Sequence, residues 1–92
     1  FPDRSTYSGK ILNDILVNNK NMSVKASHLL FSFNRWEKMD EIEQKLMNKI
    51  NLIVDRYAFS GVAYSIANGA PKNYTLVPDE GLIRPDLVLQ LD

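Results

Sequence analysis

Apolar residues recur every three or four positions along four stretches of the chain, a spacing typical of amphipathic helices. Three of these stretches begin near residues suited to capping a helix. Ser5 or Thr6 precedes the first and Ser23 precedes the second, while Asp40 with Glu43 resembles a capping box at the third. The pattern therefore predicts helices at residues 7–17, 24–37, 40–49 and 57–67.

Two shorter runs are apolar without the helical period. Residues 51–54 (Asn-Leu-Ile-Val) and 86–91 (Asp-Leu-Val-Leu-Gln-Leu) are typical of buried strands. The predicted helix 57–67, a polar loop and a turn at 78–81 separate them. A strand, a helix and a second strand in this order predict a βαβ unit with parallel strands. We therefore expect an α/β fold in which a parallel sheet is flanked by helices.

The composition limits the class of protein. A chain of 92 residues holds one small domain, and 45% hydrophobic with 24% charged residues is ordinary for a globular protein. Lysine and arginine together number 11, as do aspartate and glutamate, so no basic surplus indicates a nucleic-acid partner. No apolar run is long enough to span a membrane or to form a signal-peptide core. We expect a soluble protein of the cytoplasm, with the nucleus as a second location.

Metal-binding residue types are scarce. Cysteine is absent and His28 is the single histidine, so no metal site is predicted. We expect His28 to be exposed or hydrogen-bonded to a partner rather than catalytic.

Asp55 and Arg56 directly follow the first predicted strand. Ligands of open α/β sheets bind beyond the carboxyl ends of the strands. Charges at that edge need a partner, which can be a ligand, an ion or each other. Ser60 and Tyr64 follow Arg56 at intervals of four, so the three residues share one helical face. Gly61 lets a ligand or a neighbouring backbone approach closely.

Phe31 and Arg35 are four residues apart in a predicted helix and are therefore neighbours on its surface. The ring can stack on a planar base, and the guanidinium can reach an acceptor on the edge of that base. The alternative is a core phenylalanine with a cation–π neighbour. We assign Phe33 and Trp36 to the hydrophobic core.

Arg4 lies just before the start of the first predicted helix. The amides at a helix start and a nearby guanidinium both suit a phosphate group. The alternative is a surface arginine beside Asp3, because a single arginine is rarely informative.

Four segments of the chain also resemble, in the same order, segments of eukaryotic and poxviral thymidylate kinases, which phosphorylate dTMP to dTDP. They are residues 1–6 (Phe-Pro-Asp-Arg-Ser-Thr), 28–37 (His-Leu-Leu-Phe-Ser-Phe-Asn-Arg-Trp-Glu), 55–65 (Asp-Arg-Tyr-Ala-Phe-Ser-Gly-Val-Ala-Tyr-Ser) and 78–89, which contains Pro-Asp-Glu-Gly-Leu and Pro-Asp-Leu-Val-Leu. This resemblance covers nearly the whole chain. It implies part of a P-loop nucleoside monophosphate kinase fold, with residues 1–92 as the acceptor-nucleotide-binding half.

The ATP-binding loop of such kinases, G-x-x-x-x-G-K-[ST], has no match in the chain. We therefore expect a central part of a longer enzyme, without the ATP loop and without the arginine-bearing lid. The resemblance implies that residues 51–54 and 86–91 are the third and fourth strands of the family's sheet. In that sheet the first strand, which has no counterpart in residues 1–92, lies between these two. Both predicted strands would then expose backbone donors on their inner edges, so we expect the isolated chain not to fold alone.

The resemblance implies a role for each candidate residue: Arg4 and Arg56 on the dTMP phosphate, Phe31 stacked on thymine, Arg35 at the base edge, Ser60 and Gly61 beside the nucleotide, Tyr64 under the deoxyribose, and Asp55 near the magnesium and the attacking phosphate oxygens. Asp55 and Arg56 are thus the predicted catalytic residues. The implied partners are dTMP, ATP with Mg²⁺, and a second copy of the chain in a homodimer. Two departures from the family pattern are Asp3, which stands where glutamate is frequent, and Phe33, which replaces a small residue.

Two alternative functions are open at this point. The first is a non-catalytic nucleotide-binding or interaction module that kept the monophosphate pocket. The second is a kinase for another nucleoside monophosphate, which differs from the main hypothesis only in its base.

Overall fold

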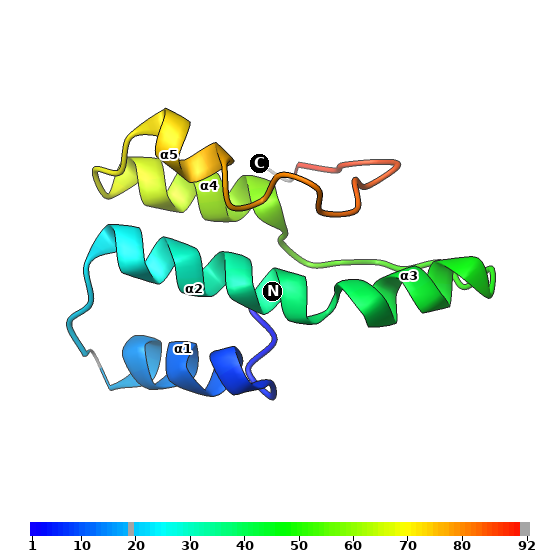
Figure 1. Ribbon diagram of the computed structural model, residues 1–92, viewed down its shortest axis with the longest axis horizontal. Coiled ribbons are helices and arrows are strands. Elements are labelled where there is room, and N and C mark those ends of the chain that lie inside the picture. The colour runs from blue at the N-terminus through cyan, green and yellow to red at the C-terminus, as the bar shows by residue number, and fades with distance from the viewer. Residues whose placement is uncertain (19, 91–92) are drawn as a thin grey trace.

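The computed structural model describes residues 1–18 and 20–90, and the regular secondary structure of this part is helical. Its helices are α1 (Tyr7–Val17), α2 (Val24–Glu37), α3 (Met39–Met47), α4 (Ala58–Ala67) and α5 (Lys72–Leu76). Helix α2 packs between α1 and α4, α5 packs on α4, and α3 continues beyond the end of α2 (Figure 1). None of these helices combines the length and the apolar character needed to cross a membrane.

The first two helices form where the sequence predicts them. Thr6 caps α1, and its Oγ1 accepts a hydrogen bond of 3.1 Å from the amide of Gly9. Ser23 caps α2 in the same way, with 3.1 Å from its Oγ to the amide of Ala26. Both caps satisfy an amide that the helix itself leaves without a partner. The predicted helix at 57–67 is also confirmed, with α4 beginning one residue later.

The capping box predicted for the third helix is wrong. Helix α3 begins at Met39, and its N-cap residue is Lys38, whose side chain makes no capping bond. Asp40 therefore lies inside the first turn rather than before it. Only Lys38 separates α2 from α3, and its carbonyl accepts a hydrogen bond of 2.9 Å from the amide of Ile42. The end of α2 thus supplies the start of α3, and no separate cap is needed.

The predicted α/β fold is wrong for the described residues. No strand forms at residues 51–54 or 86–90, and Leu91 of the second prediction lies outside the described part of the chain. A strand requires a neighbour that exchanges backbone hydrogen bonds with it, and neither segment pairs with another within residues 1–18 and 20–90. The apolar run also fails to bury its side chains, since Ile53 is fully exposed.

Helix α5 was not predicted, because its five residues lie in a segment read as a polar loop. A helix this short shows no full period of apolar residues. Thr75 is buried, and its hydroxyl donates a hydrogen bond of 2.7 Å to the carbonyl of Lys72. Polar bonding rather than an apolar face therefore holds this turn of helix.

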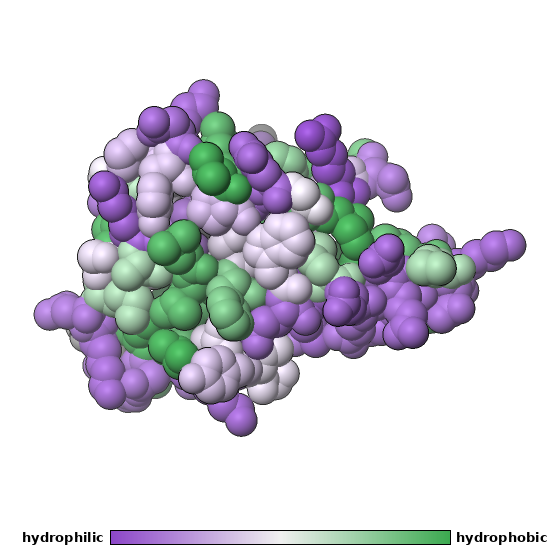
Figure 2. All heavy atoms as spheres, viewed as in Figure 1, coloured by the Kyte–Doolittle hydropathy of each residue, from purple (hydrophilic) through white to green (hydrophobic). Residues whose placement is uncertain are grey.

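Few apolar side chains are buried in the described part of the chain. The buried apolar residues among those described are Leu12, Met39, Ala70 and Leu82. Phe33 and Trp36 were assigned to the core, but they are 50% and 42% exposed, so that assignment is wrong. Figure 2 shows apolar side chains gathered in the middle of one face, over α2 and its border with α1.

Buried polar side chains join the helices instead. The His28 ring of α2 is fully buried, with Nδ1 2.6 Å from the Ser65 hydroxyl of α4 and Nε2 2.8 Å from the Thr75 carbonyl of α5. A carbonyl can only accept, so Nε2 carries the proton and Nδ1 accepts from Ser65. The prediction that His28 would be bonded to a partner is confirmed.

Candidate functional site

A hollow of about 250 Å³ opens between the N-terminal segment, α2 and the start of α4. Of the eight candidate site residues, all but Asp55 line it. The lining consists of Phe1, Pro2, Arg4, Leu16, Phe31, Arg35, Arg56, Tyr57, Ser60, Gly61 and Tyr64. Residues that are distant in the sequence are thus brought to one concave surface.

One wall of this hollow is aromatic. The ring of Phe31 on α2 lies against that of Tyr64 on α4, with 6.1 Å between the ring centroids and 61° between the ring planes. The two rings meet edge to face rather than in a parallel stack. No parallel ring is stacked on Phe31 within the described residues. A flat ligand can therefore stack there.

Two exposed arginines lie on the same hollow. Arg4 donates a hydrogen bond of 2.9 Å from Nη1 to Oδ1 of Asn13, which is neutral. Neither Arg4 nor Arg56 forms an ion pair with a carboxylate of residues 1–18 or 20–90. Their positive charges therefore favour an anionic ligand at this hollow.

Arg56 has a strained backbone. Its φ of 60° lies in the left-handed region, which costs a residue with a Cβ about 1–2 kcal/mol. Such strain persists only where the surrounding structure or a function requires it. Arg56 stands directly before the segment that leads into α4, so the unusual turn brings its side chain to the hollow.

The third arginine is neutralised. Arg35 is only 2% exposed, and its Nη2 lies 2.9 and 2.8 Å from the two carboxylate oxygens of Asp79, while Nε lies 3.1 Å from Oδ1. The Ser32 hydroxyl donates a further bond of 2.7 Å to Oδ1 of Asp79. No cation–π contact between Arg35 and Phe31 is present among the described residues. The ion pair with Asp79 takes the place of that alternative.

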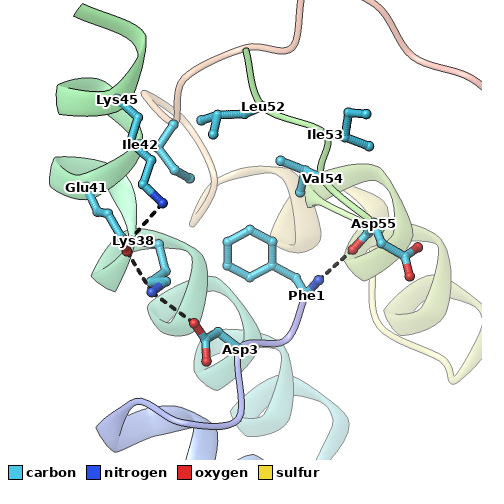
Figure 3. Close-up of a pocket in the computed structure, with 10 residues that line it drawn as sticks. All are labelled: Phe1, Asp3, Lys38, Glu41, Ile42, Lys45, Leu52, Ile53, Val54 and Asp55. Atoms are coloured by element: carbon cyan, nitrogen blue, oxygen red, sulfur yellow. Dashed lines mark hydrogen bonds and ion pairs between the residues drawn. The ribbon is translucent and has the colours of Figure 1, made fainter. Parts of the chain in front are cut away.

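Asp55 lies apart from the other candidates. It lines a second hollow, of about 300 Å³, together with Phe1 and residues of α3 (Figure 3). Its backbone carbonyl accepts a hydrogen bond of 2.5 Å from the nitrogen of Phe1, and its carboxylate points away from Phe1. In the described part of the chain no three His, Cys, Asp or Glu side chains converge on a position that could hold a metal ion.

Asp3 is paired with a lysine rather than with Arg4. Nζ of Lys38 lies 2.9 Å from Asp3 and 2.7 Å from Glu41 (Figure 3). The hydroxyl of Ser5 and, after it, the Lys38 ammonium hold the pKa of the Asp3 carboxyl well below its ordinary value. Arg4 is exposed, as the alternative of a surface arginine beside Asp3 expects, and it forms no ion pair with Asp3.

Sequence reasoning missed four residues that line the hollow, Phe1, Pro2, Leu16 and Tyr57, and it missed Asp79, which binds Arg35. Tyr57 lines the hollow, and its hydroxyl donates a hydrogen bond of 2.8 Å to the carbonyl of Ile83, while burial raises the pKa of its phenol. Its place directly after Arg56 was the available signal. Asp79 was missed because it is 44 residues from Arg35. Only the fold reveals that contact.

The arrangement has a clear chemical meaning. An open aromatic face, two arginines without carboxylate partners in residues 1–18 and 20–90, and one arginine held in place surround a single hollow. This combination suits a small ligand with a flat ring at one end and an anionic group at the other, as in a nucleotide.

Comparison with known proteins identifies the family of the chain. The thymidylate kinase family model matches residues 1–92. The chain is similar to curated thymidylate kinases: it is 50% identical over 91 residues to that of Dictyostelium discoideum, 48% over 95 residues to that of Homo sapiens, and 47% over 92 residues to that of Arabidopsis thaliana. These alignments cover 99%, 99% and 100% of the chain, and 41%, 43% and 35% of the respective relatives. The chain belongs to the thymidylate kinase family, and it spans less than half the length of these relatives.

Proposed function

We propose that this chain carries the dTMP-binding part of a kinase that transfers the γ-phosphate of ATP to dTMP. The observation that carries the proposal is the shared hollow of Phe31, Arg4 and Arg56. A pyrimidine on the Phe31 ring and a phosphate between the two guanidinium groups would use both ends of this hollow. Family membership supports the same substrate.

The remaining lining residues have places in this arrangement. Arg35 faces the edge of the base, Ser60 and Gly61 lie beside the nucleotide, and Tyr64 packs under the deoxyribose. Stacking on Phe31 contributes about 1–3 kcal/mol to binding. Each charge-assisted arginine–phosphate contact contributes about 1.5–3 kcal/mol.

In the transfer step, an oxygen of the dTMP phosphate attacks the γ-phosphorus of ATP. The bond from that phosphorus to the β–γ bridging oxygen breaks, and ADP leaves with the electron pair. Catalysis of this kind consists mainly of positioning two anions and neutralising their charge. Arg4 and Arg56 offset the charge of the acceptor phosphate. Asp55, next to Arg56 in the chain, would lie near the magnesium and the attacking phosphate oxygens.

ATP, Mg²⁺ and a second protein copy complete the proposal. When bound, Mg²⁺ would neutralise charge on the ATP phosphates. Exposed apolar side chains on α2 and α3, among them Leu29, Phe33 and Met47, support a homodimer. The cytoplasm, with the nucleus as a second location, is the proposed site of action.

A direct assay tests the proposal. The full-length protein that carries residues 1–92 should form dTDP from dTMP in the presence of ATP and Mg²⁺. Replacement of Arg56 by methionine removes the charge while keeping an elongated side chain, and it should lower kcat/KM for dTMP by about a hundredfold. Binding of dTMP without any dTDP formation would instead identify a non-catalytic binding module.

A further inference from the structure

Asp79 and Arg35 form a nearly enclosed ion pair at the back of the hollow. Arg35 is 2% exposed, and the Asp79 side chain is 8% exposed. Three contacts of 2.8–3.1 Å join the carboxylate to Nε and Nη2, and the Ser32 hydroxyl fixes the same carboxylate from α2. A planar guanidinium held along one edge in this way has little freedom to rotate.

One nitrogen of Arg35 is left over. Nη1 has no acceptor among residues 1–18 and 20–90, although every fully buried side-chain nitrogen or oxygen there has a partner. Nη1 is therefore not sealed in the interior, and Arg35 lines the hollow. A Cβ built at Gly61 would lie 2.8 Å from Nη1, so only glycine leaves room for this nitrogen. The free edge of the guanidinium is thus presented to the ligand.

We propose that Asp79 is a positioning residue that fixes Arg35 so that Nη1 selects a base with a carbonyl at the facing edge. This inference rests on the proposed function and names a determinant of its base selectivity. Arginine has only donors, so its partner on the base must be an acceptor. Thymine and uracil present a carbonyl oxygen where cytosine presents an amino group, which is a donor. A fixed donor therefore favours the first two bases and repels the third.

The test compares three substrates in the full-length protein. Asp79→Asn keeps the size of the side chain but replaces one oxygen by an NH₂ group that opposes the guanidinium. We expect KM for dTMP and for dUMP to rise about tenfold, with kcat within about twofold of the parent. The ratio of kcat/KM for dTMP to that for dCMP should fall about tenfold. A mere loss of folded protein would lower the apparent kcat/KM for all three substrates by the same factor and would leave this ratio unchanged.

Two further variants make the result decisive. Glu80→Gln removes the neighbouring exposed carboxylate with the same change of charge, and it should leave the dTMP to dCMP ratio unchanged. Ser32→Ala removes only the hydroxyl that supports Asp79, and it should lower the ratio about threefold. If Asp79→Asn does not fold, Ser32→Ala decides the question. An unchanged ratio in the folded variants, in a parent that phosphorylates dTMP, overturns the inference, whereas a parent without kinase activity overturns the proposed function.

Discussion

Two phenylalanines two residues apart on α2 have different surroundings. Phe31 lines the hollow, whereas Phe33 is half exposed and does not line it. Phe31→Ala should raise the Kd of the full-length protein for dTMP about tenfold, because the stacking surface is lost. Titration of the protein with dTMP by calorimetry measures this change. Phe33→Ala is the matched control, and an equal loss of affinity in both variants would contradict the stacking role of Phe31.

Asp3 makes stability sensitive to acid. The pKa of its carboxyl is lower in the folded chain than its ordinary value of 3.8, chiefly through the Ser5 hydroxyl and then Lys38. Its stabilising contribution is therefore complete above that value and is lost as the pH falls below it, because the unfolded chain takes up the proton first. Urea unfolding of the full-length protein at a series of pH values should show that Asp3→Asn weakens the dependence of the free energy of unfolding on acid pH. An unchanged slope in the variant would contradict the ion-pair geometry.

At the level of single residues, the sequence predicted most of the site but not its supports. Ser60 and Tyr64 reach the same hollow because α4 repeats as their spacing indicates, whereas Arg56 precedes the helix and reaches it through its left-handed turn. Asp55 does not line this hollow. Its prediction assumed that it stands at the end of a strand, and no strand forms at residues 51–54. Asp79 has no local pattern that relates it to Arg35, so a single sequence carries no signal for the pair.

At the level of elements, Asn34 joins the N-terminal segment to α2. Its fully buried amide accepts a hydrogen bond of 2.7 Å from the amide of Asp3 and donates to the Asp3 carbonyl, to Thr6 and to Ser8 at 2.8–3.1 Å. Asn34→Ala leaves the Asp3 amide without a partner and removes three donated bonds, so it should lower the free energy of unfolding by about 2–4 kcal/mol. Chemical denaturation of the full-length protein measures the loss. Asn21→Ala, at an exposed loop position, should be neutral, and equal effects would contradict the role of Asn34.

The residue after the C-cap has a strained backbone in α3 but not in α4. Lys49 follows its C-cap with φ 60°, whereas Gly69 follows the C-cap of α4 with φ 99°. A residue with a Cβ is strained in this region and glycine is not, so Lys49→Gly should raise the free energy of unfolding by about 0.5–1 kcal/mol. Lys45→Gly, in the last turn of α3, should instead lower it by about 1 kcal/mol. Denaturation curves that show destabilisation by both changes would contradict the left-handed conformation of Lys49.

Helices were predictable and strands were not, for one physical reason. A helix satisfies its backbone within a few residues, so local spacing and caps at Thr6 and Ser23 determine it. A strand depends on a neighbour that can lie anywhere in the chain. Residues 51–54 carry the apolar side chains of a strand, but no neighbouring strand pairs with them within the described residues.

At the level of the whole molecule, apolar burial is too limited to support cooperative folding. Only four apolar side chains are buried in the described residues, and buried polar groups such as His28 and Asn34 supply much of the interior. A small apolar core leaves little free energy to offset chain entropy. We expect the isolated chain of residues 1–92 to melt without a sharp transition in calorimetry. A single cooperative peak would contradict this prediction.

The strained backbone of Arg56 has a consequence for how the chain can change. Glycine at this position would relieve the strain, as it does at Gly69, but it would also remove a guanidinium from the hollow. A library of variants screened only for heat resistance would therefore enrich glycine at position 56. A library screened for ligand capture would retain arginine there, so the outcome at this one codon distinguishes the two kinds of selection.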